Sequence, residues 1–478
     1  MSTRVRFAPS PTGNLHIGGA RTALYNYIFA KATGGKYILR IEDTDLERST
    51  KEFEMSQIED MKWLGLTHDE GPGVGGEFGP YHQSERMKIY QEYADKLLGE
   101  GKAFYDFCTE AELEEMSRRN KEEGTPPYTG KWKEPEHWAE AKAKISAGEK
   151  APIRFLVPDK DISFTDHVRG QVKFPKGMVG DFVIMRSNGM PTYNFCNVVD
   201  DYLHKITHVI RGEDHVNNTL RQVMVYEAIG AQVPEFAHVS LLIGEDRQKL
   251  SKRHGATSVK QYRELGYLPE ALANYLCLLG WSHPEEKDVF TIQDISKPEI
   301  FNLDRFSKSH AVYDIEKLKY INGQHIKALE VNELAKRAEA FIEQDSFYFK
   351  QTQEWQQAFI SLYQDKVHLL TDFNEYLKEV LHERFESTAE LSEILSWETT
   401  PAIKEYLAEQ LNSVTDTFVT AELFSNWMDF CKKELKIKGK PLFMGFRGVL
   451  TGQNHGADLK VLIPLTPVEV LKKRIASL

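Results

Sequence analysis

The sequence has few cysteines, and it has no long apolar run. The four cysteines lie far apart in the chain: Cys108, Cys196, Cys277 and Cys431. None forms a Cys-x-x-Cys pair, which argues against a disulfide framework and against a complete local zinc site. No apolar stretch approaches the roughly 18 residues of a membrane span, and the first residues show neither a signal core nor an amphipathic leader. We therefore expect reduced thiols, no membrane insertion and a cytoplasmic location.

The chain also lacks an excess of basic residues. Its 60 Lys and Arg against 71 Asp and Glu give a net charge of −11, which argues against indiscriminate binding of polyanions. A local basic groove is compatible with this balance. The lysines between residues 432 and 440 would supply one, although a solvated helix end explains that run equally well. Because 478 residues exceed what one core usually spans, we expect several domains.

Hydrophobic patterning predicts an α/β domain in the first half of the chain. Residues 4–45 follow the order strand, glycine-rich loop, helix and strand, which is a βαβ unit. The other elements expected there are helices over 44–65, 84–98 and 217–229, and strands over 206–210 and 238–243. Crossovers of this kind build a doubly wound parallel sheet.

Two other regions depart from that pattern. Between residues 103 and 186, charged helices, a Pro-Pro loop and short strands indicate an insertion into the first domain. After about residue 332 almost the whole sequence is amphipathic with helical periodicity. The predicted fold class is therefore α/β: a Rossmann-type parallel-sheet domain with an α+β insertion, followed by an all-helical C-terminal region.

A glycine-rich loop follows the first strand, from Pro9 to Gly19, and leads directly into a helix. Such a bend directs free backbone N–H groups and the positive end of the helix dipole at an anion. His16 within the bend could donate a hydrogen bond to phosphate oxygens. An ordinary strand-to-helix turn with a capping histidine explains the local sequence about equally well.

A basic loop lies far downstream, from Gly244 to Gly255. Its cations Lys249, Lys252 and Arg253 follow a buried strand, and mobile cations there would neutralise charge that develops on a triphosphate. Taken alone, such a segment is more often a solvated basic loop. The presence of both loops in one chain favours chemistry at a nucleotide phosphate.

The two loops resemble the signatures of class I aminoacyl-tRNA synthetases. His16-Ile17-Gly18-Gly19 is similar to their HIGH signature, and Lys249-Leu250-Ser251-Lys252-Arg253 is similar to KMSKS. Three further stretches resemble the glutamyl branch: Phe7 to Gly13, Arg40 to Asp45 and Pro191 to Asp201. The resemblance covers the whole chain and is strongest over residues 4–85 and 189–256. It implies activation of L-glutamate with ATP and Mg²⁺, and transfer of the glutamyl group to the 3′-terminal adenosine of tRNA(Glu).

The resemblance also implies which residues bind the substrates. Those implied for glutamate are Arg6, Ala8, Ser10, Glu42, Tyr193, Asn197 and Arg211. Those implied for ATP are Thr12, His16, Gly18, Glu213, Lys249, Leu250 and Lys252. Of these, His16, Lys249 and Lys252 are expected to act in catalysis. A bidentate cation suits the side-chain carboxylate of glutamate, and Glu42 suits its ammonium group. In the alternative interpretation, Glu42 and Arg211 are satisfied strand-end ion pairs and Tyr193 fills the core.

The resemblance implies a monomer and a division of the chain into four parts. These are a catalytic domain over 1–102 and 187–243, an acceptor-end-binding insertion over 103–186, a stem-contact domain over 244–328 and a helical anticodon-binding region over 329–478. Some members hold zinc in the insertion, where this sequence offers only Asp106, Cys108, Tyr128 and Trp132. One thiol cannot supply a Cys-rich tetrahedral set, so we expect no structural zinc.

The helical C-terminal third argues against glutamine as the amino acid, because the glutaminyl enzymes carry a β-barrel there. Whether the enzyme also charges tRNA(Gln) stays open, because this depends on side chains around residues 366–372. Lys366 stands where family members that charge only tRNA(Glu) have an anticodon-reading arginine. Two other functions are compatible with parts of this pattern. A small-molecule nucleotidyltransferase leaves the helical residues without a role, and a non-catalytic tRNA-binding paralogue is expected to have lost a phosphate-contacting Lys or His, which this chain keeps.

Overall fold

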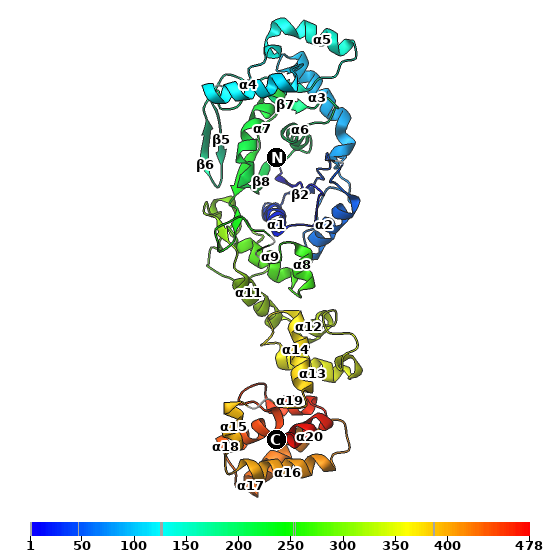
Figure 1. Cartoon of the computed structure of the whole chain (residues 1–478), viewed down its shortest axis with the longest axis vertical. Coiled ribbons are helices and arrows are strands. Elements are labelled where there is room, and N and C mark those ends of the chain that lie inside the picture. The colour runs from blue at the N-terminus through cyan, green and yellow to red at the C-terminus, as the bar shows by residue number, and fades with distance from the viewer. Residues whose placement is uncertain (1, 46, 125–127, 252, 254, 386–387) are drawn as a thin grey trace. The chain divides into compact units, whose positions relative to one another are not determined.

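The computed structural model describes residues 2–45, 47–124, 128–251, 253, 255–385 and 388–478. The chain divides into two compact units, Met1–Arg263 with Pro269–Lys317, and Glu264–Leu268 with Leu318–Leu478 (Figure 1). Among the described residues, every helix is too short or too polar to traverse a lipid bilayer.

Four parallel strands form the centre of the first unit. β1 (Arg4–Phe7) pairs with β2 (Lys36–Leu39), and β8 (His208–Gly212) pairs with β9 (Glu235–Val239). The backbone N–H of Thr207 donates to the carbonyl of Arg4 at 2.9 Å, which places β1 beside the start of β8. Parallel strands need crossover connections, and two helices supply them (Figure 1). The carboxyl ends of the strands therefore meet at one edge of the sheet, where ligands bind in open α/β folds.

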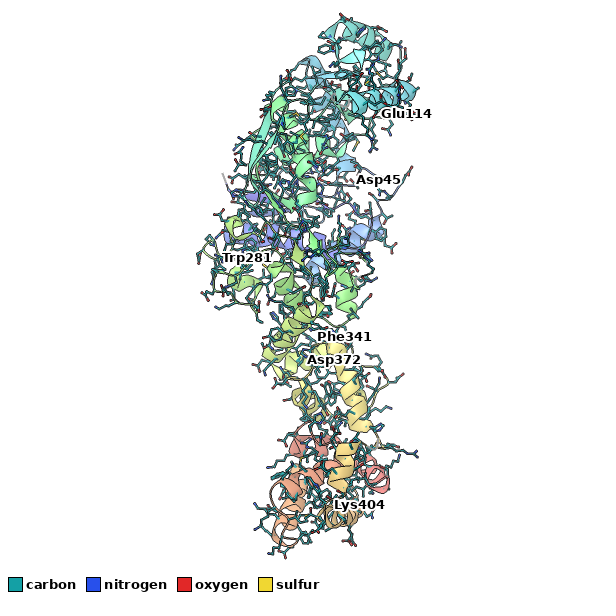
Figure 2. All side chains as sticks on the ribbon, turned by 60° about the vertical axis from the view of Figure 1, so that its left-hand side comes forward. Asp45, Glu114, Trp281, Phe341, Asp372 and Lys404 are labelled. Carbon is teal, nitrogen blue, oxygen red and sulfur yellow. The ribbon has the colours of Figure 1, made fainter. Side chains whose placement is uncertain are left out.

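The two crossover helices are α1 (Ile17–Ala32) and α7 (Val216–Ile229). Most of the side chains of α1 are buried, because alanines alternate with larger apolar residues and let the helix approach its neighbours closely. On one side α1 meets an aromatic cluster in which Tyr25 lies edge-on to Phe306 with ring centroids 4.7 Å apart. Trp281, labelled in Figure 2, is 3% exposed and lies 5.2 Å from the Phe301 ring in the same cluster. This packing fixes the middle of α1 against the aromatic cluster.

The insertion contributes a small antiparallel sheet and a hairpin. The sheet contains β3 (Ala103–Tyr105), β4 (Ile153–Phe155) and β7 (Phe182–Met185), and the hairpin contains β5 (Ile162–Asp166) and β6 (Gly170–Phe174). Asp166 of β5 pairs in parallel with Phe236 of β9, so the hairpin extends the central sheet in the order β6-β5-β9-β8. The insertion is thus joined to the parallel sheet by a strand contact that the sequence did not suggest.

Other helices of the first unit surround these sheets. They are α2 (Lys51–Trp63), α3 (Met87–Gly99), α4 (Glu110–Glu123), α5 (Trp138–Ser146), α6 (Tyr193–Leu203), α9 (Pro269–Leu278) and α10 (Ile292–Ile295). Two further helices, α8 (Val259–Glu264) and α11 (Ile315–Ala328), lie where the chain passes from one unit to the other.

Two expected elements differ from those observed. The helix expected from residue 44 begins only at Lys51, because the Thr50 side chain accepts the backbone N–H of Phe53 and caps the helix there. The strand expected over 238–243 is divided between β9, which ends at Val239, and β10 (Leu242–Ile243), which pairs with β11 (Ala311–Val312). The interruption at residues 240–241 turns the chain away from the central sheet.

The second unit builds its core from short amphipathic helices, as the sequence predicted. They are α12 (Val331–Ala338), α13 (Gln353–Tyr363), α14 (Phe373–Leu381), α15 (Ala389–Leu395), α16 (Thr400–Ser413), α17 (Ala421–Lys433), α18 (Lys440–Thr451), α19 (Leu459–Leu465) and α20 (Val468–Ala476). Leu407, Trp427, Phe446 and Leu471 are among the buried side chains that join α16, α17, α18 and α20. The parallel-sheet unit and the helical unit agree with the predicted fold class.

Candidate active site

A cavity of about 410 Å³ lies at the carboxyl ends of β1 and β8. The predicted site residues that line it are Arg6, Ala8, Ser10, His16, Gly18, Glu42, Tyr193, Asn197, Arg211, Lys249 and Leu250. Thr12 and Glu213 are not among its lining residues, and Lys252 lies outside the described residues. The structure therefore brings together most of the residues that the sequence singled out, from five separate stretches of the chain.

His16 is the N-cap of α1, and its hydrogen bond determines which ring nitrogen carries the proton. Its Nδ1 accepts the backbone N–H of Gly18 at 3.1 Å, which leaves the ring proton of the neutral form on Nε2. Partial burial and, to a lesser extent, the charge of Lys249 lower the pKa of His16 below its ordinary value. The imidazole is therefore neutral near pH 7 and presents one N–H donor.

Backbone hydrogen bonds hold the two predicted signature loops together. The N–H of Ile17 donates to Thr257 at 2.9 Å, and the N–H of Val259 donates to Leu15 at 3.0 Å. These bonds pair the glycine-rich loop with the segment that follows the basic loop. The approach of two segments so distant in sequence is thus fixed by main-chain contacts and not by the charged side chains themselves.

The basic loop begins as a tight hairpin after β10. The N–H of Leu250 donates to the carbonyl of Leu242 at 3.1 Å, and the Leu250 side chain is 5% exposed. Lys249 beside it is 72% exposed at its side chain, and its Nζ lies 3.7 Å from Asp214 Oδ2. Arg253 pairs with Asp246 at 2.9 Å. Leu250 anchors the hairpin, and Lys249 can reach a ligand at the cavity mouth.

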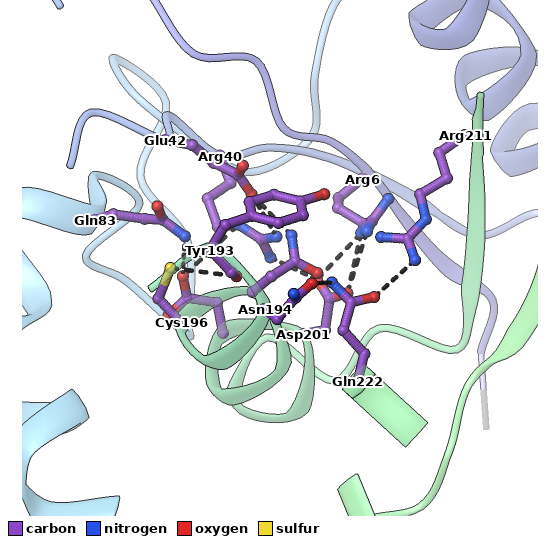
Figure 3. A network of polar contacts seen from close by, with 12 residues as sticks. Arg6, Arg40, Glu42, Gln83, Tyr193, Asn194, Cys196, Asp201, Arg211 and Gln222 are labelled. Carbon is purple, nitrogen blue, oxygen red and sulfur yellow. Dashed lines mark hydrogen bonds and ion pairs between the residues drawn. The ribbon is translucent and has the colours of Figure 1, made fainter. Parts of the chain in front are cut away.

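Arg6 of β1 and Arg40, which directly follows β2, share one buried aspartate. Arg6 Nε lies 3.1 Å and Arg40 Nη1 lies 2.5 Å from Asp201 Oδ1 (Figure 3). Burial alone would raise the pKa of Asp201, but the two arginines hold it below its ordinary range. Arg6 is accordingly a charge-compensated residue at the cavity wall.

Glu42 faces the cavity between two donors. Its Oε1 accepts from Arg40 Nη2 at 3.0 Å and from Asn197 Nδ2 at 2.9 Å. Burial raises its pKa, and Arg40 opposes that rise. Asn197 Oδ1 is buried without a hydrogen-bond partner within the described part of the chain. The predicted strand-end ion pair is thus present at Glu42, although its carboxylate still lines the cavity.

Arg211 is 5% exposed and has no carboxylate partner among the described residues. Its Nη2 donates to Thr219 Oγ1 and to Gln222 Oε1, each at 2.6 Å, and its Nε donates to His238 Nε2 at 3.3 Å. Its Nη1 is buried and finds no acceptor within the described residues. Burial lowers the pKa of Arg211, yet a guanidinium stays charged at neutral pH. The cavity wall therefore carries a guanidinium charge whose hydrogen-bond acceptors among the described residues are neutral.

Tyr193 covers the cavity between the arginines and the loop after β8. Its hydroxyl lies 3.2 Å from His215 Nδ1, and burial raises its pKa. Figure 3 shows its ring beside Arg40 and Glu42. The side chain is only partly buried and lines the cavity, so it has a surface that a ligand can contact.

Several residues of this site were not identified from the sequence. Arg40 and Asp201 lie inside stretches that the sequence singled out, but neither was given a role. Thr219, Gln222 and His238 carry no local signal, because α7 and β9 place them beside Arg211 only in the folded chain. Glu213, expected near the ATP ribose, pairs with Arg169 and accepts the N–H of Leu241 at 2.7 Å.

The zinc region of the insertion forms a small hydrogen-bonded core. Tyr128 donates from its hydroxyl to Asp106 Oδ1 at 2.9 Å, and Cys108 Sγ lies 3.7 Å from that hydroxyl. Burial, with the neighbouring Asp106, raises the pKa of Cys108 to about 11. Trp132 is buried in the same small core. Within the described part of the chain, no three His, Cys, Asp or Glu residues are grouped to hold a metal ion. Absence of structural zinc stays a prediction.

Comparison with known proteins identifies the family. Residues 2–320 match the family of class I tRNA synthetases (E and Q), catalytic domain, and residues 333–478 match an anticodon binding domain. The chain is 43% identical to a glutamate–tRNA ligase of Fervidobacterium nodosum, over 99% of this chain and 98% of that one. It is 44% identical to a glutamate–tRNA ligase of Carboxydothermus hydrogenoformans, over 99% of each chain.

A solved structure is similar over the full length. The glutamate–tRNA ligase of Elizabethkingia meningosepticum, determined in complex with its amino acid, superposes with a TM-score of 0.86 at 32% identity, covering 100% of this chain and 99% of that one. Both halves of the fold therefore have counterparts in one relative. The chain belongs to the glutamate–tRNA ligases, a family of class I aminoacyl-tRNA synthetases.

Proposed function

We propose that the cavity at the ends of β1 and β8 binds L-glutamate and ATP side by side and joins them as glutamyl-adenylate. The glutamyl group then passes to the 3′-terminal adenosine of tRNA(Glu), by attack of a ribose hydroxyl on the mixed anhydride. ATP use follows from membership of the class I family. The assignment of roles to individual residues rests on the geometry of the cavity.

The observation that carries the proposal is the uncompensated guanidinium of Arg211. A buried charge is costly unless an opposite charge accompanies it, and the described neighbours of Arg211 are neutral acceptors. An anionic side chain on the substrate supplies the missing partner, and its two oxygens suit the planar fork of a guanidinium. Arg211 is therefore the residue that selects glutamate. Arg6, already paired with Asp201, lines the same region and adds a second cation.

The remaining wall suits the α-amino group of the substrate. The Glu42 carboxylate offers an ionic acceptor for the ammonium group, and Asn197 Oδ1 and Tyr193 offer neutral hydrogen bonds. Ala8 and Ser10, which follow β1, line the cavity where the substrate backbone would lie. This arrangement leaves the α-carboxylate free to attack phosphorus.

The phosphate end of the cavity is built from the two loops. His16 Nε2–H at the N-terminus of α1 presents a donor to the triphosphate beside Gly18, and Lys249 brings a mobile positive charge. These groups position ATP and neutralise charge that develops as pyrophosphate leaves, so no side-chain nucleophile is needed. Thr12, Glu213, Leu250 and Lys252 are assigned to ATP binding by family resemblance.

Magnesium is expected with the triphosphate. It takes oxygen ligands, and the carboxylates that line the cavity are Glu42, engaged by Arg40 and Asn197, and Asp214. Asp214 is thus the residue that would hold the ion, and Mg²⁺ would supply charge neutralisation on the leaving pyrophosphate. We expect no structural zinc, and a metal analysis that finds about one zinc per purified chain would overturn this expectation.

The tRNA is bound along the rest of the chain. We assign residues 103–186 to the acceptor end, 244–328 to the stem and 329–478 to the anticodon, and we expect the enzyme to act as a monomer in the cytoplasm. Lys366, whose Nζ lies 5.6 Å from the centroid of the Tyr363 ring, is placed in the anticodon-binding region. Whether tRNA(Gln) is also charged depends on the side chains around this residue.

The proposal is tested by ATP–pyrophosphate exchange with glutamate or glutamine, with and without tRNA. We expect exchange with glutamate that requires tRNA. Exchange with glutamine but not glutamate would refute the role of Arg211, and no exchange with any amino acid would refute adenylate formation. Charging of separate transcripts of tRNA(Glu) and tRNA(Gln) then measures acceptor specificity, where glutamylation of the second transcript identifies a non-discriminating enzyme.

A further inference from the structure

A buried series of hydrogen bonds connects Arg211 to Asp166. Arg211 Nη2 contacts Thr219 Oγ1 at 2.6 Å, Thr219 Oγ1 lies 2.8 Å from His238 Nε2, and His238 Nδ1 lies 2.6 Å from Asp166 Oδ2. These four side chains are 5% exposed or less. They come from β8, α7, β9 and the last residue of β5. The hairpin of the insertion thus reaches the arginine that we assign to the substrate carboxylate.

Asp166 determines which atom donates and which accepts in this series of hydrogen bonds. Its Oδ1 accepts the backbone N–H groups of Val168 at 2.9 Å and Arg169 at 2.8 Å, and its Oδ2 accepts the backbone N–H of His238 at 3.0 Å. Burial raises the pKa of Asp166, but its hydrogen bonds with the His238 ring and with the backbone N–H groups of Arg169 and Val168 bring it below its ordinary value. An ionised carboxylate only accepts hydrogen bonds, so His238 Nδ1 must carry a proton.

His238 therefore presents a lone pair toward Arg211. Burial is the largest cause that lowers the pKa of His238, against the opposing hydrogen bond from Asp166, so the ring is neutral near pH 7 with its single proton on Nδ1. Its Nε2 then accepts from Arg211 Nε at 3.3 Å, while the single proton of the Thr219 hydroxyl is shared between this nitrogen at 2.8 Å and the His215 carbonyl at 3.1 Å. In the other tautomer, two N–H groups would face each other across the 3.3 Å between His238 Nε2 and Arg211 Nε.

We propose that Asp166 and His238 are positioning residues for glutamate recognition: Asp166 selects the His238 tautomer that holds Arg211 through a neutral acceptor. The contrast with Arg6 shows the consequence. Asp201 both orients Arg6 and neutralises it, whereas the imidazole orients Arg211 without adding a negative charge beside it. No carboxylate of the protein neutralises Arg211 at these contacts, so its charge can pair with the side-chain carboxylate of the substrate. This inference rests on the proposed role of Arg211.

A simpler role for the same residues is to fasten the insertion hairpin to the sheet. Asp166 is the residue of β5 that pairs with Phe236 of β9, and its hydrogen bonds to backbone N–H groups serve that purpose whatever the tautomer of His238. A purely structural role predicts loss of stability and loss of all activities together. A role through the tautomer predicts a change confined to glutamate binding.

The test is a double-mutant cycle measured by tRNA-dependent ATP–pyrophosphate exchange. In Asp166→Asn, the amide oxygen can accept the Val168 and Arg169 N–H groups while its NH₂ group faces His238 Nδ1, which forces the opposite tautomer. The same NH₂ group cannot accept the His238 backbone N–H, and this loss is common to both backgrounds of the cycle. We expect the glutamate KM to rise about 10- to 100-fold, with kcat and the ATP KM nearly unchanged. In His238→Gln the amide oxygen can replace Nε2 as an acceptor. Adding Asp166→Asn to His238→Gln should change the glutamate KM little, because a glutamine has no tautomer to select.

The control is Asp161→Asn, which changes an exposed aspartate that accepts the Lys176 backbone N–H at 2.9 Å beside the same hairpin. It should leave the glutamate KM unchanged. An equal KM increase from Asp166→Asn in both backgrounds, or no increase in either, would overturn the proposal. If Arg211→Met leaves the glutamate KM unchanged, the failure lies in the proposed function and not in this inference.

A direct observation of the tautomer needs no change in activity. Nitrogen-15 NMR of the parent protein labelled at histidine, with the His238 signals assigned by their loss in His238→Gln, should show a proton on Nδ1 and none on Nε2. A parent ring protonated at Nε2 overturns the proposal even if Asp166→Asn does not fold.

Discussion

Replacing Arg211 by methionine removes a buried positive charge and keeps much of the length and apolar volume of the side chain. If Arg211 binds the side-chain carboxylate of glutamate, the variant leaves that carboxylate buried without a cation. Breaking a buried ion pair in this way costs about 3–5 kcal/mol, which corresponds to a rise in glutamate KM of about two to three and a half orders of magnitude. The chemical step uses groups at the other end of the cavity, so kcat at saturating glutamate should change much less.

The same substitution should affect folding only slightly. The variant loses the hydrogen bonds to Thr219, Gln222 and His238, each with a net value of about 1.5–3 kcal/mol for a charged donor. It also avoids the burial of an uncompensated guanidinium, whose effective penalty is on the order of several kcal/mol. Because these terms oppose each other, we expect the free energy of unfolding to change by no more than about 2 kcal/mol.

The assay is tRNA-dependent ATP–pyrophosphate exchange at varied glutamate, with urea denaturation in parallel. The matched control is Arg4→Met, two residues before Arg6 on β1. Arg4 pairs with both oxygens of Glu70, at 2.7 and 2.8 Å, and does not line the cavity. The control should lose stability and keep its glutamate KM. A folded Arg211→Met whose glutamate KM stays within about threefold of the parent, less than about 0.7 kcal/mol, would refute the assignment.

Three further changes separate catalysis from stability. His16→Asn keeps an acceptor for the Gly18 N–H but removes the Nε2–H donor, so exchange kcat should fall about 100-fold with little change in glutamate KM; an unchanged kcat would contradict the role of the donor. Arg40→Met removes one of the two cations on Asp201 and should lower the free energy of unfolding in urea by about 3–5 kcal/mol, so a loss under about 1 kcal/mol would argue against this pairing. Burial lowers the pKa of His204 from 6.5 to about 2, so the unfolded chain binds a proton that the folded chain excludes. Stability should therefore fall by up to about 1.4 kcal/mol per pH unit below pH 6.5, and His204→Phe should reduce the difference between urea midpoints at pH 7 and pH 5; equal differences in parent and variant would contradict this reasoning.

The sequence was most informative where function depends on a short run of residues. The glycine-rich loop with His16 and the basic loop with Lys249 indicate phosphate chemistry only when they are taken together, and the structure brings both to one cavity. What the sequence could not predict is how they meet. The hydrogen bond from Ile17 to Thr257 joins main-chain groups. Because almost any residue type can form such a bond, the amino-acid sequence does not indicate it.

The partners of buried charges were also beyond sequence reasoning. Arg6, Arg40 and Arg211 all appeared as arginines on or after strands, with nothing local to tell a compensated one from an uncompensated one. The difference is set by helices α6 and α7, which place Asp201 beside the first two and Thr219 beside the third. Such contacts depend on the packing of distant segments. The strand pairing of Asp166 with β9 was missed for the same reason, because one bridge in a hairpin carries no periodic signal.

If Arg211 binds the substrate side chain, the buried ion pairs beside it would favour glutamate over glutamine. Arg6 and Arg40 pair with Asp201, Arg40 also pairs with Glu42 (Figure 3), and Arg86 pairs with Asp200 at 2.7 Å. The three cations and three anions of this network balance, so Arg211, which neutral groups contact, adds one positive charge. Glutamate, with two carboxylates and one ammonium, brings one net negative charge, whereas glutamine brings none. Binding of glutamine would therefore keep a buried charge uncompensated, at a cost of several kcal/mol. If Arg211 has the proposed role, selectivity would come mainly from the penalty on the neutral competitor, and this penalty requires the acceptors around Arg211 to be uncharged.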